Sequence, residues 1–158
     1  MDRTDMPEPA PLRLSGGCQC GAVRYALTVA PTNLSICHCR MCQKASGGPF
    51  MAFGSVPLDR IEWTRVPKTF RSSSFAERGF CEACGTPLTY QADGGWIAIT
   101  LGSLDDPSVV APRRQFGLEG RLPWTQNLDA LPGETTQQWM ARLGQTPFTN
   151  YQHPDHDG

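Results

Sequence analysis

The cysteines are the residues of this chain whose type and spacing point most directly to chemistry. All seven stand at CxC or CxxC spacing, in three groups: Cys18 and Cys20; Cys37, Cys39 and Cys42; Cys81 and Cys84. Cysteines that serve only as small apolar side chains would be scattered, whereas metal ligands recur at these short spacings. An odd number also excludes a complete set of disulfides. The spacing therefore predicts metal binding.

The segments CQCG (18–21) and CEACG (81–85) have the form of two half-sites for zinc. Zinc–sulfur bonds of about 2.3 Å in a tetrahedron place the sulfurs roughly 3.8 Å apart. A CxxC in a tight turn meets this spacing, and glycines around the CxC allow its chain to kink. Joined, Cys18, Cys20, Cys81 and Cys84 make a closed structural site. A second partition stays open on spacing alone, in which CHCRMC joins one half-site and the other lacks a partner.

The triplet Cys37, Cys39 and Cys42 is one ligand short of a closed zinc site. Three protein ligands with an exchangeable fourth position are typical of catalytic zinc. Three thiolates leave the metal little positive charge, so it suits a soft ligand such as a substrate thiol better than a hydrolytic water. Zinc deprotonates a bound thiol and makes it a nucleophile held in place. We therefore expect an open zinc site with a thiol substrate.

Histidines add few candidates. His38 stands between two cysteines and is a fourth ligand, a proton shuttle or a partly exposed residue without a role. Adjacent residues of an extended segment point to opposite sides, which favours a non-ligand. His153 and His156 lie in a polar, turn-rich C-terminal stretch, and we expect both to be exposed to solvent.

Three basic residues stand close to the cysteines in sequence. Arg40 and Lys44 flank the triplet, and Arg78 precedes the second half-site. A thiol that carries carboxylates, such as glutathione, would find charge partners there. A solvated basic face is the alternative interpretation for each residue singly.

The rest of the chain predicts a mostly β fold. Short runs rich in β-branched and aromatic residues alternate with Gly, Pro, Asp and Ser. The predicted strands are 22–29, 49–56, 60–64, 69–73, 87–92 and 96–104, with a hairpin turn at 92–95. Short helices are predicted at 39–46 and 135–144, the second ending at Gly144. The expected architecture is twisted antiparallel sheets with a zinc-ribbon-like site of four cysteines and few short helices.

The length and net charge of the chain limit its domain organisation and the classes of partner it can bind. A chain of 158 residues predicts one domain. We divide it into a flexible arm at 1–13, a zinc-binding β domain at 14–132, and a short helix with a polar tail at 133–158. A net charge of −1 argues against nucleic-acid binding. No apolar run approaches the roughly 20 residues of a membrane span, and the first residues lack the apolar core of a signal peptide, so we expect a cytoplasmic protein.

Four segments together resemble a known family. The runs GGCQCGAVRY, CHCRMCQKASGGPFMAF, SSSFAERGFCEACGTPL and ITLGSLDDP look like the glutathione-dependent formaldehyde-activating enzymes, which include centromere protein V-like proteins. The resemblance covers residues 14–132. It implies a fold shared with methionine-sulfoxide reductase B. It also implies a structural zinc on Cys18, Cys20, Cys81 and Cys84 and a second zinc on Cys37, Cys39 and Cys42.

The activity that this resemblance implies is the condensation of formaldehyde with glutathione to S-hydroxymethylglutathione, a carbon–sulfur lyase reaction. The sequence departs from the family at Gln115, where such proteins often have a histidine before an aromatic residue. A zinc-stabilised binding module without activity is the alternative function. The centromere relatives suggest a nucleic-acid binder, against which the charge argues. The expected partners are therefore a small-molecule thiol and an aldehyde, and the oligomeric state is left open.

Overall fold

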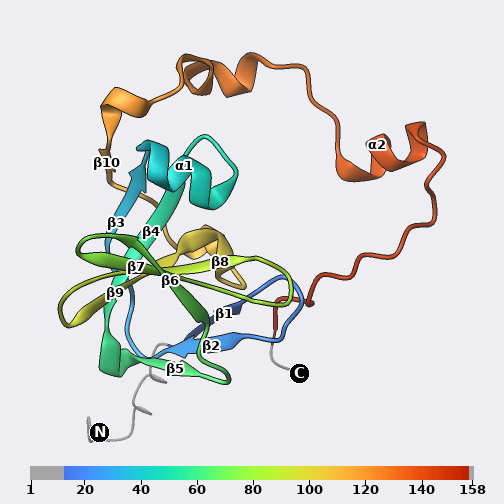
Figure 1. The fold of residues 1–158 in the computed structure, drawn as a ribbon. Coiled ribbons are helices and arrows are strands. Elements are labelled where there is room, and N and C mark those ends of the chain that lie inside the picture. The colour runs from blue at the N-terminus through green and yellow to red at the C-terminus, as the bar shows by residue number, and fades with distance from the viewer. Residues whose placement is uncertain (1–12, 157–158) are drawn as a thin grey trace, which may run out of the picture.

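Two β-sheets form the body of the protein (Figure 1). The structure is a computed structural model that describes residues 13–156. The larger sheet has seven strands in the order β10-β3-β4-β9-β8-β7-β6, and the smaller sheet has the order β1-β2-β5. All neighbouring strands are antiparallel except β10 and β3, which run parallel. The predicted mostly β fold with few short helices is therefore confirmed.

The strands are β1 Leu14–Gly17, β2 Arg24–Leu27, β3 Thr32–Cys37, β4 Met51–Pro57, β5 Ile61–Trp63, β6 Lys68–Ser73, β7 Ala76–Phe80, β8 Pro87–Ala92, β9 Trp96–Thr100 and β10 Arg114–Phe116. The α-helices are α1 Arg40–Ser46 and α2 Thr136–Arg142. Short 3-10 helices are η1 Leu58–Arg60, η2 Leu101–Ser103, η3 Pro107–Val109, η4 Leu118–Gly120 and η5 Pro123–Ala130.

Each predicted strand overlaps an observed one, and both helices form where they are predicted. The turn at 92–95 joins β8 to β9 as an antiparallel hairpin. The predicted strand at 96–104 is too long, because the chain turns into η2 after Thr100. Strands β1, β3, β7 and β10 lack a clear apolar alternation and are missed. Of the predicted flexible arm at 1–13, only Arg13 lies within the described residues, where it pairs with Glu62.

The main core lies between the two sheets. It is made of buried aliphatic and aromatic side chains from both sheets, of which Tyr25, Leu27, Leu88 and Ile99 are at most 2% exposed. Cys18 and Cys81 belong to this cluster. A smaller cluster of Cys42, Met51 and Phe53 lies under α1. The two cysteine pairs and the cysteine triplet therefore contact two different clusters of the interior.

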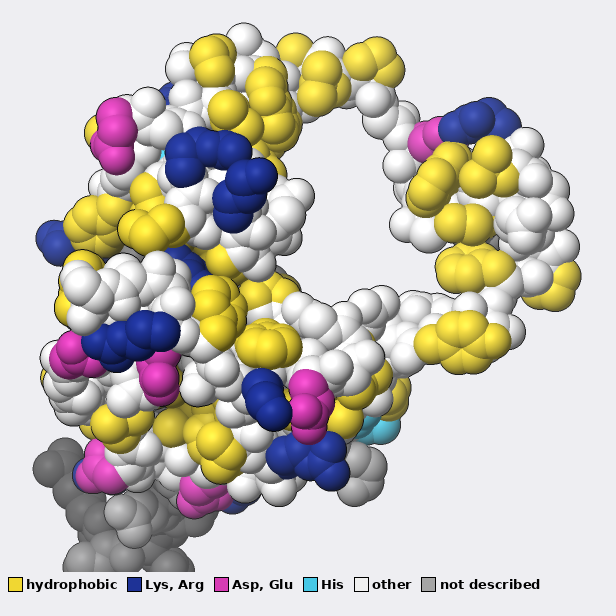
Figure 2. Space-filling view, in the orientation of Figure 1, with side chains coloured by type: hydrophobic (Ala, Val, Ile, Leu, Met, Phe, Trp, Pro, Cys, Tyr) yellow, Lys and Arg dark blue, Asp and Glu magenta, His cyan; other side chains and the backbone are white. Residues whose placement is uncertain are grey.

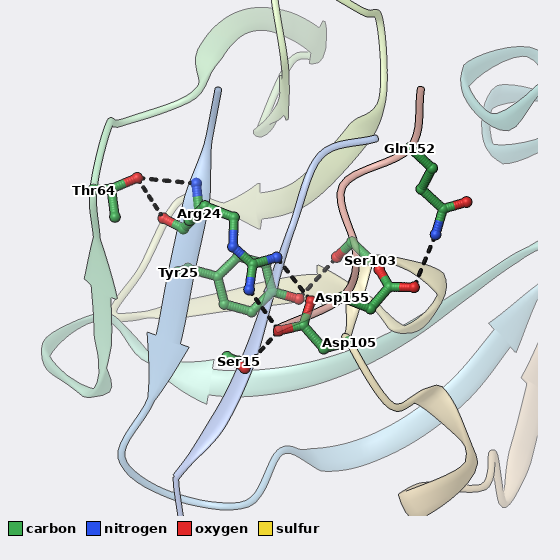
Figure 3. Close-up of polar contacts among 8 residues, drawn as sticks. All are labelled: Ser15, Arg24, Tyr25, Thr64, Ser103, Asp105, Gln152 and Asp155. Atoms are coloured by element: carbon green, nitrogen blue, oxygen red, sulfur yellow. Dashed lines mark hydrogen bonds and ion pairs between the residues drawn. The ribbon is translucent and has the colours of Figure 1, made fainter. Parts of the chain in front are cut away.

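A buried ion pair joins the small sheet to the chain beyond β9 (Figure 3). Both nitrogens Nη1 and Nη2 of Arg24 donate to the carboxylate of Asp105, at 2.7 and 2.5 Å. Ser15 donates to the same carboxylate. These hydrogen bonds hold the pKa of Asp105 below its usual value, Arg24 having the larger effect. Beside them, the hydroxyls of Tyr25 and Ser103 lie 2.8 Å apart.

The segment 121–152, here called the arm, leaves the body after η4 and returns to it at His153 (Figure 1). Figure 2 shows an opening between the arm and the body, with hydrophobic side chains along the arm. Several large apolar side chains of the arm are exposed: Trp124, Leu128, Leu131, Trp139, Leu143, Phe148 and Tyr151. These apolar side chains are therefore left largely uncovered by the residues that the structure describes.

The arm ends against the loop that carries the first cysteine pair. The backbone N–H of His153 donates to the carbonyl of Gln19 at 2.7 Å. A Cβ atom added at Gly21 would stand 2.5 Å from a ring carbon of His153, so the ring packs on that glycine. The expectation that His153 is exposed is therefore wrong, because this docking half-buries it, whereas His156 is exposed.

Neither α-helix in the described range is long enough or apolar enough to cross a membrane.

Candidate metal centres and the adjoining cavity

The four cysteines of the two pairs meet at one point. Their sulfur atoms all lie within 4.8 Å of one another, although about sixty residues separate the pairs in sequence. The Sγ atom of Cys20 lies 3.6 Å from that of Cys18 and 3.8 Å from that of Cys81. These distances match the edge of roughly 3.8 Å of a tetrahedral zinc–thiolate site. The cluster therefore fits a structural zinc, and the alternative partition of the ligands is not the one that the fold brings together.

Local backbone geometry turns each pair inward. Gly21 and Gly85 follow the pairs with φ angles of 77° and 79°, a region that glycine enters without strain. The N–H of Gly85 donates to the carbonyl of Cys81 at 2.8 Å, which closes the CxxC turn. The hydroxyl of Thr86 lies 3.1 Å from the sulfur of Cys84. Burial raises the pKa of Cys84, but the Thr86 hydrogen bond and neighbouring amides lower it to about 6 overall.

The triplet forms a second cluster where β3 meets α1. Cys37 ends β3, Cys39 precedes the first residue of α1, and Cys42 lies in the first turn of that helix. Their sulfurs lie within 4.8 Å of one another, and those of Cys37 and Cys39 are 3.3 Å apart. No fourth cysteine, histidine or carboxylate joins this group among residues 13–156. The donor set fits a zinc held by three thiolates, which leaves one position for another ligand.

His38 points away from the cluster. Its Nε2 atom lies 2.9 Å from Oε1 of Gln115, and its ring contacts Phe50 edge-on with centroids 5.6 Å apart. The side chain is 3% exposed, so the description as a partly exposed histidine is wrong. The alternation of side chains that disfavoured His38 as a ligand agrees with this placement.

A cavity of about 490 Å³ opens beside the three cysteines. It runs over one face of the large sheet, because alternate residues of a strand share a face: β3 contributes Asn33, Ser35 and Cys37. Further lining comes from neighbouring strands and α1: Cys39, Met41, Cys42, Phe53, Ser55, Arg78, Tyr90, Ala98, Arg114 and Phe116. Its size falls within the roughly 300–1,000 Å³ of small-molecule sites. The thiols therefore face a space that a small ligand can enter.

The three basic candidates from the sequence are placed differently. Arg78 is 4% exposed and lines the cavity, with Nη2 3.3 Å from the sulfur of Cys42. Arg40 is exposed and donates to Gln43, and it does not line the cavity. Lys44 is exposed and lines a separate hollow of about 290 Å³, which Arg78 also borders. The structure thus brings only Arg78 to the three cysteines.

Burial and hydrogen bonds act on the thiols in opposite directions. Burial raises the pKa of Cys42 to about 12, although the hydrogen bond from Arg78 lowers it. For Cys39 the raising effect of burial is outweighed by hydrogen bonds from the amides of Cys42 and Met41 and from the neighbouring thiols, so its pKa is lowered. Cys42 would therefore need the stabilisation of a bound cation to be a thiolate at neutral pH.

Strand β10 supplies cavity residues that the sequence alone did not reveal. It pairs in parallel with β3, so Arg114 stands opposite Ser35 and Phe116 opposite Cys37. Gln115, between them, faces His38 instead of the cavity. Nothing in a run of three residues indicates pairing with a strand eighty positions earlier. The parallel register, visible only in the structure, brings Arg114 to the cavity.

Comparison with known proteins agrees with this architecture. The family model for the glutathione-dependent formaldehyde-activating enzyme matches residues 13–119, which is more than half of the chain. The chain belongs to this family. The matched range of the family model contains all seven cysteines and β10 but ends before the arm.

Two curated proteins resemble the chain. An uncharacterized lyase of Schizosaccharomyces pombe is 36% identical over 80 residues, which span 51% of this chain and 58% of that protein. A Halomonas elongata protein, provisionally named a glutathione-dependent formaldehyde-activating enzyme, is 27% identical over 152 residues, 83% of this chain and 96% of its own length. A Rhodobacter sphaeroides protein of known crystal structure shares the fold, with a TM-score of 0.52 at 18% identity. It matches 64% of this chain and 98% of its own.

Proposed function

We propose that this family member is a zinc-dependent enzyme of the carbon–sulfur lyase type. It would form or break the adduct between a thiol and an aldehyde, with S-(hydroxymethyl)glutathione from glutathione and formaldehyde as the expected case. The observation that carries the proposal is that Cys37, Cys39 and Cys42 line a cavity while His38, the nearest histidine in sequence, is turned to Gln115. A three-cysteine cluster with an accessible side has no evident structural purpose.

Each cysteine cluster would have its own role. Cys18, Cys20, Cys81 and Cys84 would hold a structural zinc, and Cys37, Cys39 and Cys42 a second one. When bound there, zinc supplies a soft Lewis acid that lowers the pKa of an entering thiol and fixes its sulfur. The chain's own contribution is to hold the three thiols at the cavity wall and to surround the substrate with apolar groups and hydroxyls.

The proposed reaction balances without a further co-reactant. The sulfur of the thiol bonds to the carbonyl carbon, the thiol gives up its proton, and the carbonyl oxygen gains one to become a hydroxyl. Tyr90, Ser35 and Ser55 bring hydroxyls to the cavity. Burial raises the pKa of Tyr90 above its usual value, so its phenol is protonated at neutral pH and able to donate to an alkoxide.

The part of the cavity that Arg114 lines suits the acidic part of the thiol. Arg114 stands opposite Ser35, two residues along β3 from Cys37. Two residues of a strand span about 6.6 Å, which is the scale on which a carboxylate of a tripeptide thiol lies from its sulfur. The exposed guanidinium of Arg114 would therefore meet a carboxylate when the thiol lies at the cysteines.

The proposal is tested by exchange spectroscopy of glutathione with formaldehyde, because the reaction also proceeds without a catalyst. Reduced, zinc-loaded protein should accelerate the exchange between free and adduct forms, and the Cys39→Ser variant should not. In a cobalt-substituted sample, glutathione should alter the d–d bands, whereas S-methylglutathione, which has the same carboxylates but no thiol, should not. Equal exchange rates with wild-type protein, Cys39→Ser and buffer, with cobalt bands indifferent to thiol, would favour the zinc-stabilised binding module instead.

A further inference from the structure

Arg78 is a buried cation that contacts sulfur atoms, among them the thiol of Cys42. It comes from the middle of β7 and is 4% exposed. No carboxylate lies within ion-pair distance of it among the residues that the structure describes. A buried charge without a partner is costly, so buried arginines are normally paired. The groups available to balance Arg78 are the thiols of the triplet.

The guanidinium is held on every side. Its Nε donates to Oγ of Ser72 at 2.9 Å, Nη1 to Sδ of Met51 at 3.7 Å, and Nη2 to Sγ of Cys42 at 3.3 Å. Its central carbon lies 4.9 Å from the centre of the Tyr90 ring, in cation–π contact. These contacts orient the guanidinium of Arg78 toward Cys42.

The net charge of a metal bound at the triplet gives a physical reason for the contact between Arg78 and Cys42. A divalent metal with three thiolates carries one net negative charge, and here it would lie at the wall of a largely buried cavity. An adjacent guanidinium makes the assembly neutral and donates a hydrogen bond to one of the sulfurs. Partners that hydrogen-bond metal ligands typically contribute 10- to 100-fold in metal affinity.

We propose that Arg78 is a positioning residue of the three-cysteine site: it balances the charge of the three thiolates and fixes the sulfur of Cys42, rather than binding the carboxylate of the substrate. The assignment rests on the proposed metal role of the triplet. It replaces the sequence-based interpretation of Arg78 as a contact for glutathione. Carboxylate recognition then belongs to Arg114, which also lines the cavity.

The test is a chelator competition on reduced, metal-loaded protein, in which each cysteine cluster loses its metal in a separate phase of the titration. The Cys39→Ser variant identifies which phase belongs to the triplet. Arg78→Met keeps an apolar side chain of similar length and should weaken that phase 10- to 100-fold while the four-cysteine phase is unchanged. Arg78→Lys keeps the charge and should recover part of the loss. Arg40→Met is the matched control, because Arg40 adjoins Cys39 in sequence but donates to Gln43. It should change the affinity less than threefold.

A spectroscopic readout separates this role from mere packing. A hydrogen bond to a thiolate stabilises the sulfur lone pair, so its loss in Arg78→Met should shift the sulfur-to-cobalt charge-transfer band to lower energy. An unshifted band with affinity within twofold of wild type would overturn the proposal. So would equal weakening of both sites in Arg78→Met and Arg78→Lys, because Arg78 would then support only the fold. If wild-type protein bound metal at the triplet but added thiols did not change the metal spectrum, the proposed function would be contradicted. The role of Arg78 would be unaffected by that result.

Discussion

The Nε2 atom of His38 lies 2.9 Å from the Oε1 atom of Gln115, and this contact lies on the side of β10 that does not line the cavity. The neighbours of Gln115 in β10, Arg114 and Phe116, both line the cavity. Gln115 thus covers a buried histidine and does not reach the three cysteines. The residue at position 115 therefore bears on how His38 is covered.

Replacing Gln115 tests this assignment. In Gln115→Ala, His38 loses its hydrogen-bond acceptor, and we expect a loss of about 1 kcal/mol in the free energy of unfolding, the net value of one such bond. Metal content and thiol affinity should stay at wild-type values. Denaturant melts and thiol titration of the metal-loaded protein measure the two effects. A tenfold loss of thiol affinity with unchanged stability would place Gln115 in the substrate site instead.

Gly117 holds β10 against the metal-binding loop. Its φ is 64°, and a Cβ atom there would stand 2.6 Å from the backbone nitrogen of Cys39. Gly117→Ala should therefore displace Cys39 and weaken metal binding at the triplet at least tenfold, while the four-cysteine site is retained.

Gly144→Ala is the matched control for that variant. Gly144 has a φ of 68°, and nothing lies within 4 Å of a Cβ atom there. It should show the strain of a left-handed residue, about 1–2 kcal/mol, without an effect on metal. Equal metal affinities in the two variants would mean that β10 does not position Cys39.

Much of the site was predictable because metal ligands are a local signal. The half-sites 18–21 and 81–85 are recognisable from residue type and spacing, and so is the incomplete triplet. What surrounds the triplet is only partly predictable: the sequence nominates Arg78, but as a contact for a substrate carboxylate. Arg78 sits in a strand with two charged residues, and Arg114 in one of three residues, so neither strand shows an apolar period. Their approach to the cysteines is decided by long-range pairing, which leaves no trace in local sequence.

The two cysteine groups should differ in their contribution to stability. Cys81 is 1% exposed and belongs to the main core, so Cys81→Ser opens a buried structural site and should destabilise the domain by more than about 4 kcal/mol. Cys39 lies at the cavity, and Cys39→Ser should lower zinc per chain with a much smaller change in melting temperature. Elemental mass spectrometry and thermal melts measure both. Equal melting-temperature losses would contradict the division into structural and functional sites.

The Arg24–Asp105 pair predicts an acid-dependent part of the stability. Because Arg24 lowers the pKa of Asp105 in the folded protein, the pair stabilises the fold above the ordinary value of 3.8 and loses this contribution as the pH falls through the folded pKa. Asp105→Asn should cost about 3 kcal/mol at neutral pH, since it removes a carboxylate that pairs with the buried guanidinium of Arg24. Below pH 3.8 its stability should fall less steeply than that of wild type.

The control for this variant is Asp93→Asn. Asp93 also pairs with an arginine, Arg71, but both side chains are more than half exposed, so the change should have little effect at either pH. Chemical denaturation across the pH range measures all three proteins. If the free energy of unfolding varied with pH in the same way in wild type and Asp105→Asn, Asp105 would not contribute to the acid dependence of stability.

The position of Arg114 predicts that the cavity prefers thiols that carry a carboxylate. Arg114 stands opposite Ser35, two residues along β3 from Cys37. This register fixes the distance between the guanidinium of Arg114 and a thiol sulfur bound at the cysteines, and it does not require a particular shape of the rest of the ligand. We therefore expect Arg114→Ala to weaken glutathione binding about tenfold, the worth of roughly 1.4 kcal/mol, with an unchanged affinity for 2-mercaptoethanol, which has no carboxylate.

Arg113→Ala removes the same charge one residue earlier. Arg113 does not line the cavity beside the cysteines, and its backbone N–H bonds to Leu34. A general effect of net charge would weaken glutathione binding equally in Arg113→Ala and Arg114→Ala and would fade in salt for both. Contact with the carboxylate would confine the loss to Arg114→Ala and to thiols that carry one. Titration of the cobalt-substituted variants with glutathione and 2-mercaptoethanol distinguishes these outcomes. The d–d bands show whether the thiol sulfur binds the metal, and the ratio of the two affinities shows how much the carboxylate contributes.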